Sequence, residues 1–73
     1  MQDHATNTIR LSVNGEAREF AAPLSVRALL RELALPTERL AVELNRELLP
    51  RTGFDHVLHE GDALEIVTFV GGG

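Results

Sequence analysis

Hydrophobic and polar residues alternate near the start of the chain, which is the pattern of a strand with one buried face. The hydrophobic series is Ile9, Leu11 and Val13. The dipeptide Asn14-Gly15 follows it and favours the positive φ angles of a tight hairpin turn. A returning strand is predicted over residues 16–20, with Phe20 as its core residue. The first third of the chain is therefore predicted to be a β-hairpin.

The next segment has the spacing of an amphipathic helix. Hydrophobic residues recur at positions that line one helix face, namely Val26, Leu29, Leu30 and Leu33. Ser25 precedes them and is a favoured N-cap, because its hydroxyl can accept a hydrogen bond from an unpaired backbone N–H. Pro36 disfavours helical geometry in the residue before it. A helix is therefore predicted over residues 25–34.

The second half of the chain predicts further strands. Alternation predicts a strand over 40–45, a turn at 45–47 and a short edge segment at 48–49 that ends at Pro50. A loop with a helical turn at 54–57 should fill 51–60, before a turn at 60–62 and a last strand over 63–70. This order indicates an α+β fold, a mixed sheet of four to five strands covered on one face by one helix. The expected core is Ile9, Leu11, Val13, Phe20, Val26, Leu29, Leu30, Leu33, Val42, Leu44, Leu64 and Ile66.

Length and charge limit the classes of function. The 73 residues suit one small domain, with a flexible leader at 1–8, a folded part at 9–70 and a flexible glycine tail at 71–73. The net charge of −4 argues against nucleic acid or an anionic membrane as partner, since both favour a basic surface. No apolar run approaches the roughly 20 residues of a membrane span. The polar start is unlike a signal peptide, so a cytoplasmic protein is expected.

Side chains suited to catalysis are scarce. Two serines, three histidines and no cysteine are little material for a nucleophile and its base. His56 and His59 could share a helical face, but two imidazoles fall short of the three or four ligands usual for zinc. They are interpreted as loop histidines, and the carboxylates of Glu43 and Glu47 as solvated surface. We expect no catalytic residue, no metal site and no enzymatic activity of the chain by itself.

The final glycines, Gly71, Gly72 and Gly73, are the informative motif. A phosphate-binding glycine loop leads into a helix, and none follows here. On composition alone the segment could be a frayed tail. Glycines can also enter a narrow channel in another protein, and four residues after Phe69 could reach roughly 13 Å beyond the sheet. The Gly73 carboxylate could then be activated as an acyl-adenylate, as in a tethered acyl carrier.

An ordered set of motifs resembles the ThiS family, the sulfur carriers of thiamine biosynthesis. The set is Asn14-Gly15, the segment 40–45 with Leu49-Pro50-Arg51, Glu60-Gly61-Asp62, and Glu65-Ile66-Val67 running to the final glycines. The similarity spans residues 9–73. It implies the ubiquitin-like β-grasp fold, which agrees with the predicted order of strands and helix.

The resemblance also implies a reaction and its partners. An E1-like adenylating enzyme of the ThiF type would use ATP and Mg²⁺ to convert Gly73 to an acyl-adenylate, so the carrier itself would bind no cofactor. Sulfur from a persulfide donor protein would then displace AMP and leave a thiocarboxylate. Thiazole synthase of the ThiG type would receive that sulfur.

Three other functions stay open. The small subunit of molybdopterin synthase shares the fold and the terminal chemistry, but it is usually longer and has a Phe-Pro-Pro-type segment before its glycines. This sequence has Thr68-Phe69-Val70 there. A ubiquitin-like protein modifier and a plain binding domain are the remaining alternatives.

Alternation in the last strand also predicts where partners bind. Glu65 shares a face with Val67 and Phe69, and burying an unpaired carboxylate is costly, so this face should meet solvent. Two large apolar side chains on an open sheet face commonly mark an interaction site. Val67 and Phe69 are therefore predicted to bind partners, the alternative being that strand twist returns Phe69 to the core.

Overall fold

The computed structural model of the 73-residue chain describes residues 7–69. Its elements are β1 (Thr8–Val13), β2 (Glu16–Ala21), α1 (Val26–Glu32), η1 (Thr37–Arg39), β3 (Leu40–Leu44), β4 (Glu47–Leu49), η2 (Arg51–Gly53) and β5 (Ala63–Thr68). None of the helices in the described part has the length and apolar character needed to cross a membrane. The leader residues 1–6, Val70 and the glycine tail lie outside the described residues.

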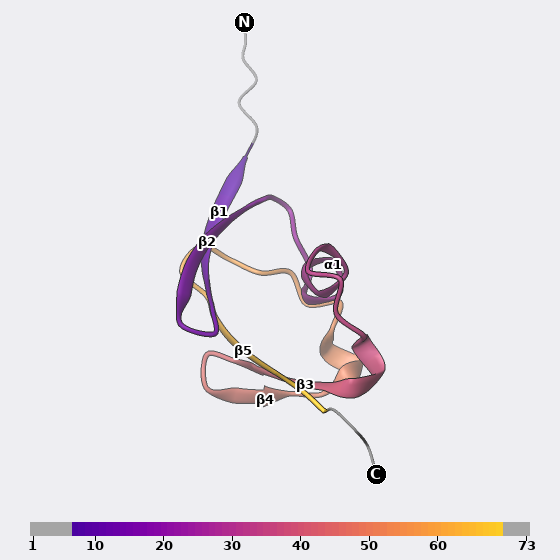
Figure 1. Cartoon of the computed structure of the whole chain (residues 1–73). Coiled ribbons are helices and arrows are strands. Elements are labelled where there is room, and N and C mark those ends of the chain that lie inside the picture. Colours follow the sequence, from indigo (N-terminus) through magenta and orange to yellow (C-terminus); the bar gives the residue numbers. More distant parts are fainter. Residues whose placement is uncertain (1–6, 70–73) are drawn as a thin grey trace, which may run out of the picture.

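Five strands form one mixed sheet with the order β2-β1-β5-β3-β4. The central strand, β5, runs parallel to β1, and the other neighbouring strands are antiparallel. The sheet curves around α1, which covers one of its faces (Figure 1). The predicted mixed sheet covered by one helix is thus confirmed for residues 7–69.

The helix begins where its sequence predicts and ends earlier. The Ser25 hydroxyl accepts a hydrogen bond from the Ala28 backbone N–H at 3.0 Å, which confirms the N-cap. The α-helix nevertheless ends at Glu32, not at residue 34 as predicted. Ala34 has a φ of 59°, so the chain turns into the left-handed region before Pro36 can act.

Other predicted boundaries were wrong as well, by one residue at the end of β2, the end of β3 and the start of β4. Strand β1 starts at Thr8, inside the predicted leader. The Asn7 carbonyl accepts a hydrogen bond from the Ala22 N–H, so the end of the predicted leader pairs with the residue that follows β2. The helical turn predicted at 54–57 lies earlier, at Arg51–Gly53, because Pro50 starts a 3₁₀ turn closed by Gly53 N–H to the Pro50 carbonyl. Strand β5 ends at Thr68 rather than at residue 70.

The core lies between α1 and the inner face of the sheet. Nine of the twelve predicted core residues are buried, and Ile9, Leu33 and Leu44 are half-buried against them. The prediction missed four buried residues, Leu24, Leu40, Phe54 and Leu58. Phe54 and Leu58 belong to the predicted loop, which therefore closes one end of the core.

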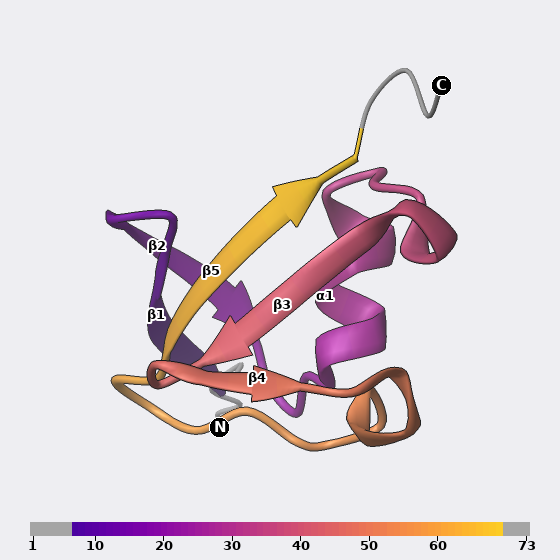
Figure 2. The same cartoon turned by 90° about the horizontal axis from the view of Figure 1, so that it is seen from below.

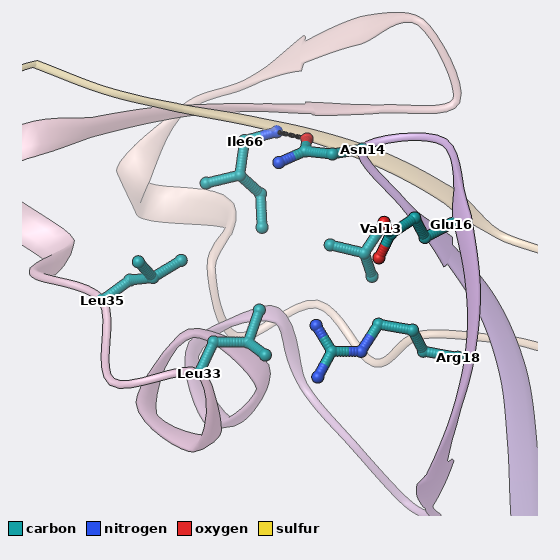
Figure 3. A pocket seen from close by; sticks show the side chains of 7 residues that line it. All are labelled: Val13, Asn14, Glu16, Arg18, Leu33, Leu35 and Ile66. Carbon is teal, nitrogen blue, oxygen red and sulfur yellow. Dashed lines mark hydrogen bonds between the residues drawn. The ribbon is translucent and has the colours of Figure 1, made fainter.

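A hollow of about 390 Å³ remains at the edge of this core, between the β1–β2 hairpin and the end of α1. Its lining residues are Val13, Asn14, Glu16, Arg18, Leu33, Leu35 and Ile66. The aliphatic side chains form its floor, and the guanidinium of Arg18 extends from β2 toward Leu33 (Figure 3). The hollow is therefore lined by four apolar side chains at the edge of the core, and Glu16 and Arg18 of β2 bring charge to its rim.

Candidate functional site

Strand β5 leads from the centre of the sheet toward the glycine tail. Its first residues pair with both neighbours, Ala63 and Leu64 with β1 and Leu64 to Thr68 with β3. The strand then runs to the end of the sheet beside the η1 turn (Figure 2). The Phe69 N–H donates to the Arg39 carbonyl at 2.7 Å, so the backbone is still held one residue after the strand ends. The exit direction of the chain is thereby fixed by β3 and η1.

Asn14 supports β5 beyond the point where β1 stops pairing with it. The Asn14 backbone N–H donates to the Leu64 carbonyl at 2.8 Å, and its side-chain Oδ1 accepts from the Ile66 N–H at 2.7 Å. The second bond is drawn in Figure 3. A turn residue thus takes the place of the missing neighbouring strand and satisfies a part-buried backbone donor. The sequence predicts Asn14 as a turn residue, but its side-chain bond depends on the β1–β5 register and was missed.

Both predicted partner-binding residues are exposed, Val67 on the outer face of β5 and Phe69 directly after the strand. Val67 is 55% exposed and Phe69 is 56% exposed, whereas Leu64 and Ile66 on the other face are buried. The predicted exposure of Val67 and Phe69 is confirmed, and the alternative that Phe69 returns to the core was wrong. Their role in binding stays a prediction.

Pairing across the sheet extends this apolar surface. Ala41 of β3 lies directly opposite Val67, and residues directly opposite in an antiparallel pair share a face. Leu48 of β4 lies on the same face opposite Glu43 and is 71% exposed. We define the outer patch as Ala41, Leu48, Val67 and Phe69. The sequence did not reveal Ala41 and Leu48 as members, because their place depends on strand order.

Two carboxylates lie within this face. Glu43 of β3 is directly opposite Glu65 of β5, and both side chains are exposed. Like charges directly opposite each other in a sheet are destabilising. Among residues 7–69, the ion pairs formed are Arg10–Glu19 and Arg27–Asp55, so neither carboxylate has a basic partner there. The outer patch is therefore apolar with an acidic centre.

The two candidate histidines lie elsewhere. His56 and His59 are exposed in the loop before β5, and the fold brings Asp62 to them. The predicted modified residue Gly73 and its neighbours Gly71 and Gly72 lie outside the described residues. The described part of the site is thus the end of β5 and the outer patch.

Comparison with known proteins gives a consistent group of relatives. The model of the ThiS family matches residues 11–73. The crystal structure of a thiamine biosynthesis protein (ThiS) from Geobacter metallireducens superposes with a TM-score of 0.75 at 40% identity, covering 89% of this chain and 100% of that one. Its fold is that of this chain, which confirms the β-grasp architecture.

Two curated relatives differ in length. A thiazole synthase from Paramagnetospirillum magneticum is 46% identical over 66 residues, which is 89% of this chain and 20% of the relative. The chain therefore spans about a fifth of the length of that thiazole synthase. The uncharacterized protein ycf40 from Pyropia yezoensis is 44% identical over 68 residues, which is 92% of this chain and 96% of the relative.

Proposed function

The chain belongs to the ThiS family, and we propose that it is a sulfur carrier of thiamine biosynthesis in which Gly73 carries the sulfur. The observation that supports this assignment best is the family match, which extends through residue 73. The carrier is a non-catalytic protein, and its relatives indicate a protein partner in the thiamine pathway. The matches do not favour the small subunit of molybdopterin synthase.

The proposed chemistry takes place on the main chain. The Gly73 carboxylate attacks the α-phosphorus of ATP in an E1-like adenylating enzyme of the ThiF type, and pyrophosphate leaves. The resulting acyl-adenylate is a mixed anhydride, so the terminal sulfur of a persulfide on a donor protein can displace AMP and form an acyl disulfide with the donor. A thiol then attacks the donor sulfur of this acyl disulfide, forms a disulfide with it and releases the thiocarboxylate. ATP and Mg²⁺ belong to the adenylating enzyme. We propose that the reaction takes place in the cytoplasm.

Thiazole synthase of the ThiG type is the proposed acceptor. The match of this chain to a fifth of a protein named thiazole synthase supports this choice, because a carrier and its acceptor gain effective concentration when they share one chain. The carrier would dock on thiazole synthase and deliver the thiocarboxylate sulfur.

The outer patch is the proposed docking surface for both enzymes. It lies on the face of β5 that ends where the tail begins, so a partner bound there would receive the tail over a short distance. Its apolar side chains offer area to bury, and the facing Glu43 and Glu65 favour a partner with a basic side chain at the centre of the contact. Such a residue would offset the repulsion between the two carboxylates.

Intact-mass analysis tests the role of Gly73. The chain is incubated with the adenylating enzyme, Mg-ATP and sulfide, and the product should be heavier by the difference between a sulfur and an oxygen atom. Deleting Gly73 should abolish this gain. The melting temperature of the deletion variant should stay unchanged, since a terminal glycine contributes ~0 kcal/mol to packing. Sulfur gain by the deletion variant would refute the proposal.

A second variant separates the tail from the docking surface. Replacing Gly72 with Leu should block transfer by steric conflict in the channel of the adenylating enzyme, while binding through the outer patch persists. If the Gly72→Leu variant lost binding as well as sulfur transfer, the tail rather than the outer patch would provide most of the affinity.

A further inference from the structure

The loop before β5 brings three potential metal ligands together. His56, His59 and Asp62 each offer one ligand atom, and these atoms lie within 4.8 Å of one another. The two imidazole rings meet edge to face with their centroids 6.1 Å apart. The spacing in the sequence indicates only the pair of histidines. The turn at 59–62 brings the Asp62 carboxylate close to them.

Hydrogen bonds fix the carboxylate of Asp62. Its Oδ2 accepts from the His59 backbone N–H at 2.8 Å, and the Asp62 N–H donates to the His59 carbonyl at 3.0 Å. Asn45 Nδ2 donates to Oδ1 at 3.1 Å. A carboxylate has about four lone-pair sites, so each oxygen keeps capacity for a further ligand. Outer contacts of this kind orient the ligands in protein metal sites.

The backbone of both histidines is also held by the fold. The His56 carbonyl accepts from the Val26 N–H at 3.0 Å. Leu58, between the histidines, is buried and donates its N–H to the Leu24 carbonyl at 2.8 Å. The loop therefore presents both imidazoles outward from a fixed base.

We propose that His56, His59 and Asp62 bind a divalent first-row transition metal, for which Zn²⁺ is the probe. Two imidazole nitrogens and one carboxylate oxygen suit zinc and its neighbours, whereas Mg²⁺ and Ca²⁺ prefer oxygen ligands alone. Zinc–ligand bonds of about 2.0–2.2 Å require the three atoms to approach one another more closely. The exposed imidazoles can rotate to do so, and three protein ligands leave a position for water.

The proposed metal site is remote from the outer patch. It lies at the start of β5, and Phe69 lies at the other end, about 20 Å away at the rise of an extended strand. A metal at the loop would therefore leave the tail and the docking surface accessible. This inference does not depend on the proposed function.

Calorimetric titration of the untagged full chain with Zn²⁺ tests the proposal. We expect binding of one ion per chain, weakened at least tenfold in His59→Ala and in His56→Ala. His4→Ala is the matched control, since it removes the third histidine of the chain from outside the loop, and it should bind as the parent does. Circular dichroism establishes that each variant is folded.

Three outcomes would overturn the proposal. They are no binding by the parent chain, undiminished binding by both loop variants, and loss of binding in His4→Ala. Zinc should also raise the melting temperature of the parent and leave that of His59→Ala unchanged, because a ligand that binds the folded state stabilises it. Sulfur loading at Gly73 should remain normal in the loop variants, so failure of the metal site and failure of the carrier role are distinguishable.

Discussion

Ala34 adopts a backbone conformation that alanine rarely has. Its φ is 59°, and it follows Leu33 at the end of α1. The Ala34 N–H donates to the Arg31 carbonyl and the Leu35 N–H donates to the Leu30 carbonyl, both at 3.0 Å. These two bonds are those of a Schellman motif, in which glycine is the usual left-handed residue.

Replacing Ala34 with Gly should therefore stabilise the chain. The left-handed conformation costs an L-residue roughly 1–2 kcal/mol, and part of the gain is lost to the greater freedom of glycine in the unfolded chain. We expect the free energy of unfolding in urea to rise by about 0.5–1 kcal/mol. Ala28→Gly, within the helix, is the matched control and should lower it by a similar amount. A decrease for both variants would show that the left-handed conformation of Ala34 costs less than the freedom that glycine adds to the unfolded chain.

Leu30 tests the packing of the element that covers the sheet. Its side chain is 0% exposed in the core between α1 and the strands. Leu30→Ala should lower the free energy of unfolding by roughly 2–5 kcal/mol, through lost burial and the cavity that remains. Leu48→Ala removes the same atoms from a side chain that is 71% exposed, and should change it by no more than about 0.5 kcal/mol. Equal effects in the two variants would contradict the assigned helix face.

The elements themselves were largely predictable because each has a regular pattern. Alternation placed β1, β3 and β5, and the Ser25 cap with the leucine spacing placed α1. The segment 51–62 was less predictable, since its hydrophobic residues follow no period. Phe54 and Leu58 pack into the core, and backbone hydrogen bonds between distant parts of the chain hold them there: the Arg27 N–H donates to the Phe54 carbonyl and the Leu58 N–H to the Leu24 carbonyl.

At the scale of the molecule, the sequence predicted the outward side chains of β5 and could not predict what surrounds them. Alternation along the strand and its one charged residue, Glu65, were sufficient to predict that Val67 and Phe69 are exposed. Ala41, Leu48 and the facing Glu43 join them through the β5-β3-β4 order, which local patterns do not contain. Asp62, the third member of the proposed metal site, was missed for a different reason: the turn at 60–62 was predicted, but not that its geometry places the carboxylate beside His59. The predicted role of Gly73 comes from the family resemblance, which extends beyond the described residues.

Val67→Asp tests whether the outer patch docks the partner enzymes. The variant should remain folded, because Val67 is 55% exposed and surface substitutions usually change stability by no more than about 0.5 kcal/mol. It should bind the adenylating enzyme and thiazole synthase at least tenfold more weakly, since a charge in a buried contact loses its hydration without gaining a partner. Affinity is measured calorimetrically with each enzyme.

The control makes the same substitution on another surface. Val57 is 47% exposed in the loop before β5, and Val57→Asp adds the same charge away from the outer patch. It should bind both enzymes as the parent does, which removes net charge as an explanation for the effect at Val67. Val67→Ser then separates lost apolar contact from added repulsion beside Glu65, and it should weaken binding less than Val67→Asp. Normal binding by Val67→Asp, or equal weakening in the Val57 and Val67 variants, would exclude this face as the docking surface.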